Sequence, residues 1–99
     1  MKNTTNRRSH FCTENKIEFK ASNLQGIWKD NCYQVISYKW YPIFVWDWGK
    51  WYENKEGYSP STKRQISNSR PCANTILVSH DEIKEIIKKC YHPNDEIYA

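Results

Sequence analysis

The sequence predicts an α+β fold: a small twisted antiparallel β-sheet, connected as a meander, with a short polar helix and a C-terminal amphipathic helix. Three observations lead to this prediction. Segments rich in β-branched and aromatic residues follow one another in the first half. A polar segment that begins with proline comes next, and apolar residues with helical spacing follow it. At 99 residues the chain has room for one core, so we expect a single α+β domain over residues 15–93.

The first half predicts the strands of the meander. Alternating or β-branched residues mark four segments, and Asp30-Asn31 and Gly49 suit tight turns between them. Gly49 leads into a short strand that contains Trp51 and Tyr52. We expect the two helices to cover only one face of this sheet, which leaves one or two tryptophans near the surface. The four segments are Lys16–Ala21, Leu24–Lys29, Cys32–Tyr38 and Pro42–Trp48.

The second half predicts two helices and a strand. Ser59-Pro60 is a typical helix start, and a residue before proline avoids helical dihedrals, so the polar helix should span about Pro60–Ser69. Its only interior apolar residue is Ile66. We therefore expect it to rest on Tyr58 and Ile66 and to direct its other side chains outward, namely Lys63, Arg64, Ser67 and Ser69.

The C-terminal helix is the element that the sequence marks most clearly. The strand Thr75–Val78 precedes a capping box, in which Ser79 and Glu82 satisfy each other's backbone donors. Apolar residues then recur at i, i+3, i+4 and i+7, with Lys84 and Lys88 away from this stripe. The predicted helix spans Asp81–Lys89. The stripe consists of Ile83, Ile86, Ile87 and Cys90.

Charge is unevenly distributed along the chain, whose formal net charge is +4. Residues 1–14 are expected to form a flexible basic arm, and residues 94–99 an acidic tail with Asp95 and Glu96. The start of the chain lacks the apolar stretch of a secretory signal, and the longest apolar run is far below the roughly 20 residues of a membrane span. We therefore expect a cytoplasmic protein.

Cysteine and histidine residues are the candidates for metal binding or catalysis. The chain has four cysteines, and a reducing cytosol disfavours disulfides. His10 and Cys12 form one closely spaced pair, and Cys90 and His92 form another, but both fit zinc-ligand spacing loosely. No catalytic motif is recognisable. We predict no metal, no cofactor and no enzymatic activity; a small enzyme using a Cys/His pair and a zinc-stabilised adaptor are the alternatives.

Basic residues beside aromatic ones indicate binding. Cations contact phosphates, and exposed rings stack on bases. Residues 57–80 contain basic side chains and no aspartate or glutamate. The alternative is that the rings belong to the core and that the basic helix face is merely solvated. The predicted partner-binding residues are Lys50, Trp51, Tyr52, Tyr58, Lys63, Arg64 and Arg70.

The segment from Ser37 to Pro71 carries a resemblance to a known group of proteins. It reads SYKWYPIFVWDWGKWYENKEGYSPSTKRQISNSRP, and it resembles a family of small proteins of unknown function encoded by bacteriophages and plasmids. The matching positions are Ser37, Tyr38, Tyr41, Pro42, Val45, Asp47, Trp51, Tyr52, Asn54, Tyr58, Ser59, Thr62, Arg64, Arg70 and Pro71. The resemblance implies a mobile-element origin and no particular activity.

Together, the basic residues and the resemblance predict a non-catalytic accessory protein of a phage or plasmid. Its expected partner is a nucleic acid or a nucleic-acid-handling host complex, for example in the inhibition of a host defence of the CRISPR type. The same charged surface serves a nucleic acid or an acidic protein, so the sequence leaves these two partners open, together with the oligomeric state. No membrane partner is expected.

Overall fold

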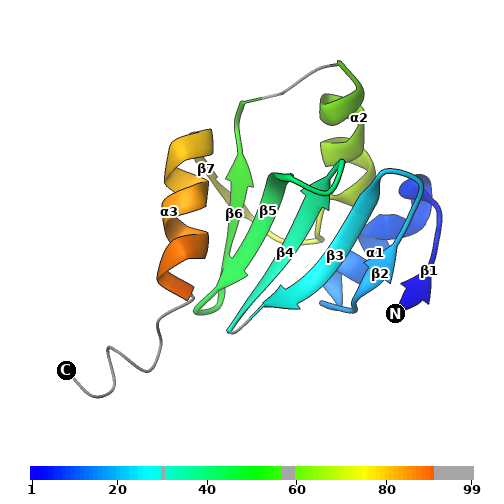
Figure 1. Cartoon of the computed structure of the whole chain (residues 1–99), viewed down its shortest axis with the longest axis horizontal. Helices are drawn as coiled ribbons and strands as arrows, with labels where there is room; N and C mark the ends of the chain where they lie inside the picture. The colour runs from blue at the N-terminus through cyan, green and yellow to red at the C-terminus, as the bar shows by residue number, and fades with distance from the viewer. Residues whose placement is uncertain (30, 57–59, 91–99) are drawn as a thin grey trace.

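The structure is a computed structural model that describes residues 1–29, 31–56 and 60–90. Within them, a seven-stranded sheet has its strands in chain order (Figure 1). The strands are β1 (Lys2–Asn3), β2 (Phe19–Lys20), β3 (Leu24–Lys29), β4 (Cys32–Ser37), β5 (Tyr41–Asp47), β6 (Lys50–Asn54) and β7 (Thr75–Val78). The helices are the 3₁₀ turn η1 (Asn6–Arg8), α1 (Ser9–Glu14), α2 (Pro60–Ser69) and α3 (His80–Cys90).

The predicted α+β class and the antiparallel meander are confirmed. Strands β2 to β6 pair with antiparallel neighbours. Both outer strands pair in parallel, β1 with β2 and β7 with β6. A β7 parallel to β6 requires a crossover, and the segment that contains α2 provides it. The predicted strand Lys16–Ala21 is reduced to Phe19–Lys20, and the predicted turn at Asp30 falls partly outside the described residues.

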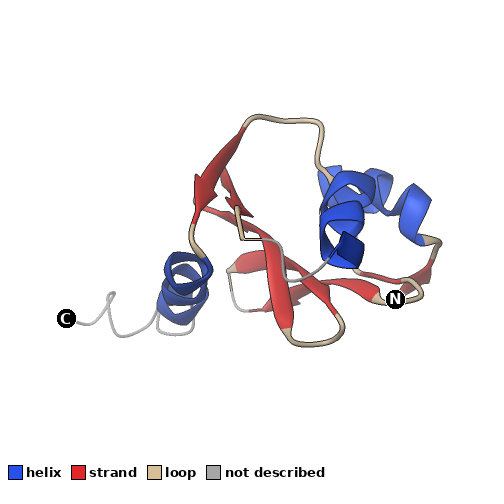
Figure 2. Ribbon diagram, turned by 90° about the horizontal axis from the view of Figure 1, so that it is seen from above, coloured by secondary structure: helices blue, strands red, loops and turns tan. Residues whose placement is uncertain are grey.

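Helices cover both faces of the sheet, so the expectation of one covered face is wrong. Helices α1 and α2 lie on one side and α3 on the other (Figure 2). The central strand β5 is therefore enclosed on both sides, and Ile43, Phe44 and Val45 are all fully buried. Continuous burial replaces the alternation that a one-sided sheet would show.

Aromatic rings dominate the core on the α1/α2 side. Tyr33 is fully buried, with its ring edge-on to Trp28 at 5.6 Å and to Trp51 at 6.2 Å between centroids. Burial raises the pKa of Tyr33. Position 26 is a glycine at a close approach, because a Cβ there would clash with the Tyr33 hydroxyl and the Phe19 ring, and both side chains are fully buried.

The first fourteen residues fold onto the sheet, and the expectation of a flexible arm does not match the structure. Residues Ser9, Cys12 and Thr13 on α1 are buried. The turn after α1 is closed by a hydrogen bond in which the Ile17 amide donates to the Cys12 carbonyl at 2.9 Å. The Thr13 hydroxyl donates to the Ser9 carbonyl at 3.1 Å, which satisfies it inside the protein. A polar sequence therefore packs here through small side chains that bond to their own helix.

Helix α2 has the predicted bounds, but its inner face is polar. Thr62, Gln65 and Ser69 are buried beside Ile66. The Ser37 hydroxyl donates to the Gln65 side-chain oxygen, and the Gln65 amide donates to the Asn23 carbonyl at 3.3 Å. The expectation that Ser69 faces solvent is wrong, because its hydroxyl donates to the Gln65 carbonyl at 2.7 Å in a buried position. Hydrogen bonds thus attach this helix to the sheet.

Helix α3 confirms the sequence prediction. The Glu82 amide donates to the Ser79 hydroxyl at 3.1 Å, and the Ser79 amide donates to the Glu82 carboxylate at 3.0 Å. The hydrogen bond from the Ser79 amide to the carboxylate, together with the Ser79 side chain, lowers the pKa of Glu82. Ile83 is fully buried against Val45 and Val78. The helix is thus capped by its own sequence and held by its apolar stripe.

Length and polarity rule out a membrane crossing by any helix in the described ranges.

Candidate nucleic-acid interface

The predicted aromatic pair is divided between the two faces of the sheet. Trp51 is 6 % exposed and meets Tyr33 and Phe44 edge-on within the core. The expectation that Trp51 offers a ring face to a partner is therefore wrong. Tyr52 points to the opposite face, where it packs half-buried against the cluster under α3. The alternative that these rings belong to the core describes Trp51 correctly.

Arg70 has a structural partner. Its guanidinium donates two hydrogen bonds to the Glu53 carboxylate, at 2.6 and 2.9 Å, and the Thr75 hydroxyl donates a third at 2.7 Å. Burial alone would raise the pKa of Glu53, but the hydrogen bonds from Arg70 and Thr75 and the charge of Arg70 outweigh it, so this pKa is lowered. Arg70 therefore joins the end of α2 to β6.

The remaining predicted residues that the structure describes come from α2 and from the start of β6. Lys63 and Arg64 are exposed on α2. Lys50 is exposed at the start of β6, whereas Lys63 lines a shallow pocket near the end of that strand with Lys55 and with Glu53, the partner of Arg70. Tyr58 lies outside the described residues. Binding by Lys63 and Arg64 stays a prediction.

A larger and more basic hollow lies on the other face of the sheet. Helix α3 covers β5, β6 and β7 there, and no described helix lies over the same face of β3 and β4. The step between helix and open sheet forms a groove of about 540 Å³, which we call the α3 groove. It is lined by Gln34, Ile36, Lys39, Trp40, Pro42, His80, Lys84, Glu85, Ile87 and Lys88.

The chemistry of the α3 groove suits an anionic ligand with flat rings. Lys84 and Lys88 are one turn apart on α3 and project on the same side of that helix. Lys39 and Trp40 come from the β4–β5 turn at the end of the groove, and Trp40 is 56 % exposed. Three lysines therefore stand against one glutamate, Glu85, around an apolar floor.

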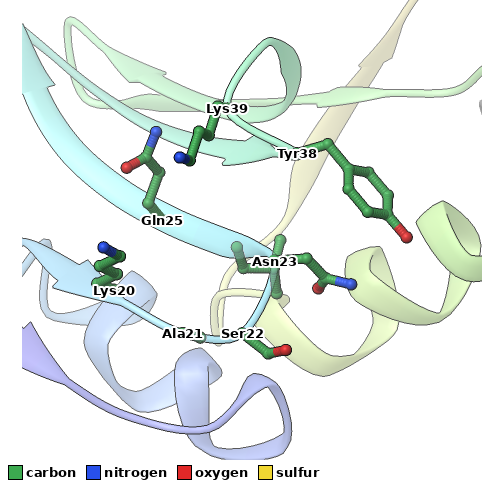
Figure 3. A pocket seen from close by; sticks show the side chains of 8 residues that line it. Lys20, Ala21, Ser22, Asn23, Gln25, Tyr38 and Lys39 are labelled. Carbon is green, nitrogen blue, oxygen red and sulfur yellow. The ribbon is translucent and has the colours of Figure 1, made fainter.

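A smaller hollow of about 190 Å³, which we call the turn pocket, adjoins the α3 groove at Lys39. It lies between the β2–β3 turn and the β4–β5 turn. Lys20, Gln25 and Lys39 line it, and Figure 3 shows the Gln25 and Lys39 side chains close to each other, with Lys20 on the strand beside β3. Among the described residues, none of the four lysines of the two hollows lies within ion-pair distance of a carboxylate. Their charges are thus available to a ligand.

The wall of the groove is fixed at the start of α3. The His80 ring stacks on the Tyr41 ring at 4.4 Å, with 8° between the planes. Asn54 lies between this ring and β5, because its amide nitrogen is 2.9 Å from the Pro42 carbonyl and 3.0 Å from Nδ1 of His80. The amide donates, so Nδ1 accepts and the proton of a neutral His80 is on Nε2. The groove is therefore bounded by a firmly attached helix.

Among the residues whose side chains the structure describes, His80 lines the α3 groove, and no cysteine lines either hollow. Cys12 and Cys32 are buried, and Cys72 is exposed. Over residues 1–29, 31–56 and 60–90 no cluster of three metal-ligating side chains is found. His92 lies outside the described residues, and so does the predicted acidic tail. The zinc-stabilised adaptor and the Cys/His enzyme stay alternatives that nothing here favours.

Sequence reasoning missed the residues that line the two hollows. It noted Lys84 and Lys88 only as the outer side of an amphipathic helix. Their four-residue spacing beside Ile87 was a usable signal. Lys39-Trp40 follows directly on a predicted strand, where a turn places both side chains at the surface. No local pattern predicted where α3 packs, and α3 covers only part of its face of the sheet.

Comparisons with protein-family models, with curated proteins and with solved structures found no match to this chain. The resemblance of Ser37–Pro71 to phage and plasmid proteins therefore stays a prediction, and so does the origin that it implies. The interpretation of the site rests on its geometry and charge.

Proposed function

We propose that the protein is a non-catalytic binding protein that takes single-stranded nucleic acid in the α3 groove. The observation that carries this proposal is an open half of a sheet face, bordered by lysines of α3 and of the β4–β5 turn, with Trp40 exposed between them. A basic groove with exposed aromatic rings is the usual arrangement for binding an unpaired strand.

The size and the lining of the groove favour a single strand over a duplex. A volume of about 540 Å³ holds a few groups of an extended chain, whereas a duplex would rest on the rim. An indole ring stacks only on a base whose face is free, and unpaired bases provide such faces. The ammonium groups of Lys39, Lys84 and Lys88 would then contact phosphates along the backbone.

The biological role that accompanies this site is the accessory role expected from the sequence. A small protein without catalytic chemistry acts by occupying a strand or by blocking a complex that handles it. Inhibition of a host defence that uses guide or target strands is one such role, and the expected place of action is the cytoplasm. The nucleic-acid site is the part of this proposal that a binding assay tests directly.

A binding assay with two triple variants tests the proposal. The ligand is a fluorescent single-stranded DNA or RNA of about 12 nucleotides, and anisotropy is measured over a range of salt concentrations. The groove variant is Lys39→Ala/Lys84→Ala/Lys88→Ala. The control, Lys55→Ala/Lys63→Ala/Arg64→Ala, removes the same charge from exposed residues of the loop after β6 and of α2, so that total charge and local site are separated.

We expect the groove variant to lose most of its affinity, and the log–log salt slope to fall by about 0.7 for each phosphate contact removed. The control should keep its slope. Equal losses in both variants would reduce the effect to net charge and contradict a site in the groove. The proposal also fails if the unmodified protein binds neither DNA nor RNA strands at low salt.

A further inference from the structure

The β4–β5 turn has a backbone conformation that its residues disfavour. The Trp40 amide donates to the Ser37 carbonyl at 3.1 Å, which closes the turn. Its central residues, Tyr38 and Lys39, both have positive φ, 52° and 69°. These are features of a type I′ turn, for which Asn-Gly is the preferred pair because a Cβ is strained in this region. Tyrosine and lysine are therefore costly at these positions.

Packing accounts for only part of these residues, although the Trp40 ring meets the Tyr41 ring edge-on at 5.3 Å between centroids. Tyr38 is 40 % exposed and Trp40 is 56 % exposed, so the two rings leave much apolar surface in water. Lys39, between them, has no ion-pair partner among the described residues. Strained backbone is concentrated at functional sites. We therefore interpret the strained turn and its exposed rings as features kept for function.

The turn also separates the two hollows. Tyr38 and Lys39 line the turn pocket, and Lys39 and Trp40 line the α3 groove. Figure 3 shows the Lys39 side chain reaching over β3 toward Gln25, above Lys20, while the Tyr38 ring extends to the other side of the turn. One cation thus stands between two rings, with a second cation across the smaller pocket.

We infer that this turn binds two consecutive unpaired nucleotides. In a strand, one phosphate joins two nucleosides, and the order base, phosphate, base corresponds to the order Tyr38, Lys39, Trp40. Lys39 and Lys20 together contact the shared phosphate, and Tyr38 and Trp40 stack on the bases to either side of it. The strand thus crosses the turn from the turn pocket into the α3 groove. The inference rests on the proposed function and adds the location at which single strands are distinguished from duplexes.

The other strained turn supplies a matched control. Trp48 and Gly49 connect β5 to β6, also with positive φ at both positions, 52° and 77°. Trp48 is 83 % exposed, yet it lines neither hollow. The variant Trp48→Asn creates the preferred Asn-Gly pair there. The variant Tyr38→Asn/Lys39→Gly creates the same pair in the β4–β5 turn.

Thermal unfolding and oligonucleotide binding are measured for both variants. We expect the melting temperature to rise by a few degrees in each, because both relieve strain in a small domain. Affinity for the single-stranded oligonucleotide should fall at least about tenfold in Tyr38→Asn/Lys39→Gly and stay unchanged in Trp48→Asn. Loss of binding by a more stable protein cannot be attributed to unfolding.

Single substitutions then assign the roles within the turn. Lys39→Ala should lower the log–log salt slope by about 0.7, whereas Tyr38→Ala and Trp40→Ala should weaken binding without changing it. Full affinity in Tyr38→Asn/Lys39→Gly would overturn the inference, and so would a lower melting temperature in that variant. If the α3 lysine variant Lys84→Ala/Lys88→Ala still loses affinity in that case, the proposed function stands without this turn. If no variant and no unmodified protein binds, both fail.

Discussion

Helices α2 and α3 lie on opposite faces of one sheet, and different kinds of contact hold them there: hydrogen bonds for α2 and apolar packing for α3. Helix α2 buries Thr62, Gln65 and Ser69, and Gln65 is hydrogen-bonded to Ser37 on β4 and to the Asn23 carbonyl. Helix α3 buries Ile83 and packs Ile86 and Ile87 against the sheet. A polar helix is thus a structural element here, while the outer side of an apolar-faced helix lines the basic groove. The polarity of a helix therefore does not by itself indicate which helix borders the groove.

The largest expected effect comes from the apolar attachment of α3. Ile83→Ala should lower the free energy of unfolding by about 2–5 kcal/mol, because it removes a fully buried side chain and leaves a cavity. Ile76→Ala, at a position 46 % exposed on β7, is the control and should change the stability far less. Chemical denaturation measures both. Equal losses in the two variants would mean that α3 is not held by Ile83.

The polar attachment of α2 should be weaker but still substantial. Gln65→Ala removes the acceptor of the buried Ser37 hydroxyl and leaves that group without its partner. The expected loss is about 1–3 kcal/mol of unfolding free energy. Ser67→Ala, on the exposed side of the same helix, should stay within about 0.5 kcal/mol. A neutral Gln65→Ala would show that this hydrogen bond does not hold α2 in place.

The start of α3 provides a smaller effect, which the sequence alone already predicted. Ser79→Ala removes the hydroxyl that accepts from the Glu82 amide. Loss of a helix N-cap lowers stability by about 0.5–2 kcal/mol. Ser79→Asp keeps an acceptor at this position, so it should restore most of the stability in the same denaturation measurement. Failure of this rescue would contradict the capping interpretation.

The smallest predicted effect is a pH dependence at the junction of α2 and β6. Since the pKa of Glu53 is lowered from 4.5 in the folded protein, its ion pair with Arg70 stabilises the fold above that pH and is lost as pH falls through the lowered value. Arg70 is half-exposed, so the contribution should be at most about 1 kcal/mol. Arg70→Ala should reduce the stability near neutral pH and flatten the acid limb. An unchanged acid limb would mean that Glu53 does not depend on Arg70.

Short sequence patterns correctly predicted the helices and strands whose formation depends on neighbouring residues. The capping box, the apolar stripe of α3 and the proline at the start of α2 all act within a few residues, and the predicted bounds were close to those observed. The packing of α1 involves instead a contact between distant parts of the chain, because the Ser9 hydroxyl donates to the Asn68 carbonyl at 3.4 Å. No periodicity marks such contacts.

The candidate site shows the same limit more strongly. Trp51 and Tyr52 are adjacent in sequence but lie on opposite faces of a pleated strand, so they could not act as a pair. Arg70 is engaged by Glu53, which is 17 positions away in the chain. The α3 groove exists only because α3 lies over part of one sheet face. Its residues come from separate elements that the fold brings together.

The most direct test of the α3 groove is a titration of isotopically labelled protein with a short single-stranded oligonucleotide, followed by amide NMR shifts. We expect the largest shifts at the β4–β5 turn, in Ile36 on β4, and in Lys84 and Lys88 on α3. Lys63 and Arg64 on α2 should change little. Shifts concentrated on α2, or an absence of shifts at saturating oligonucleotide, would contradict the assignment of the binding site to the α3 groove.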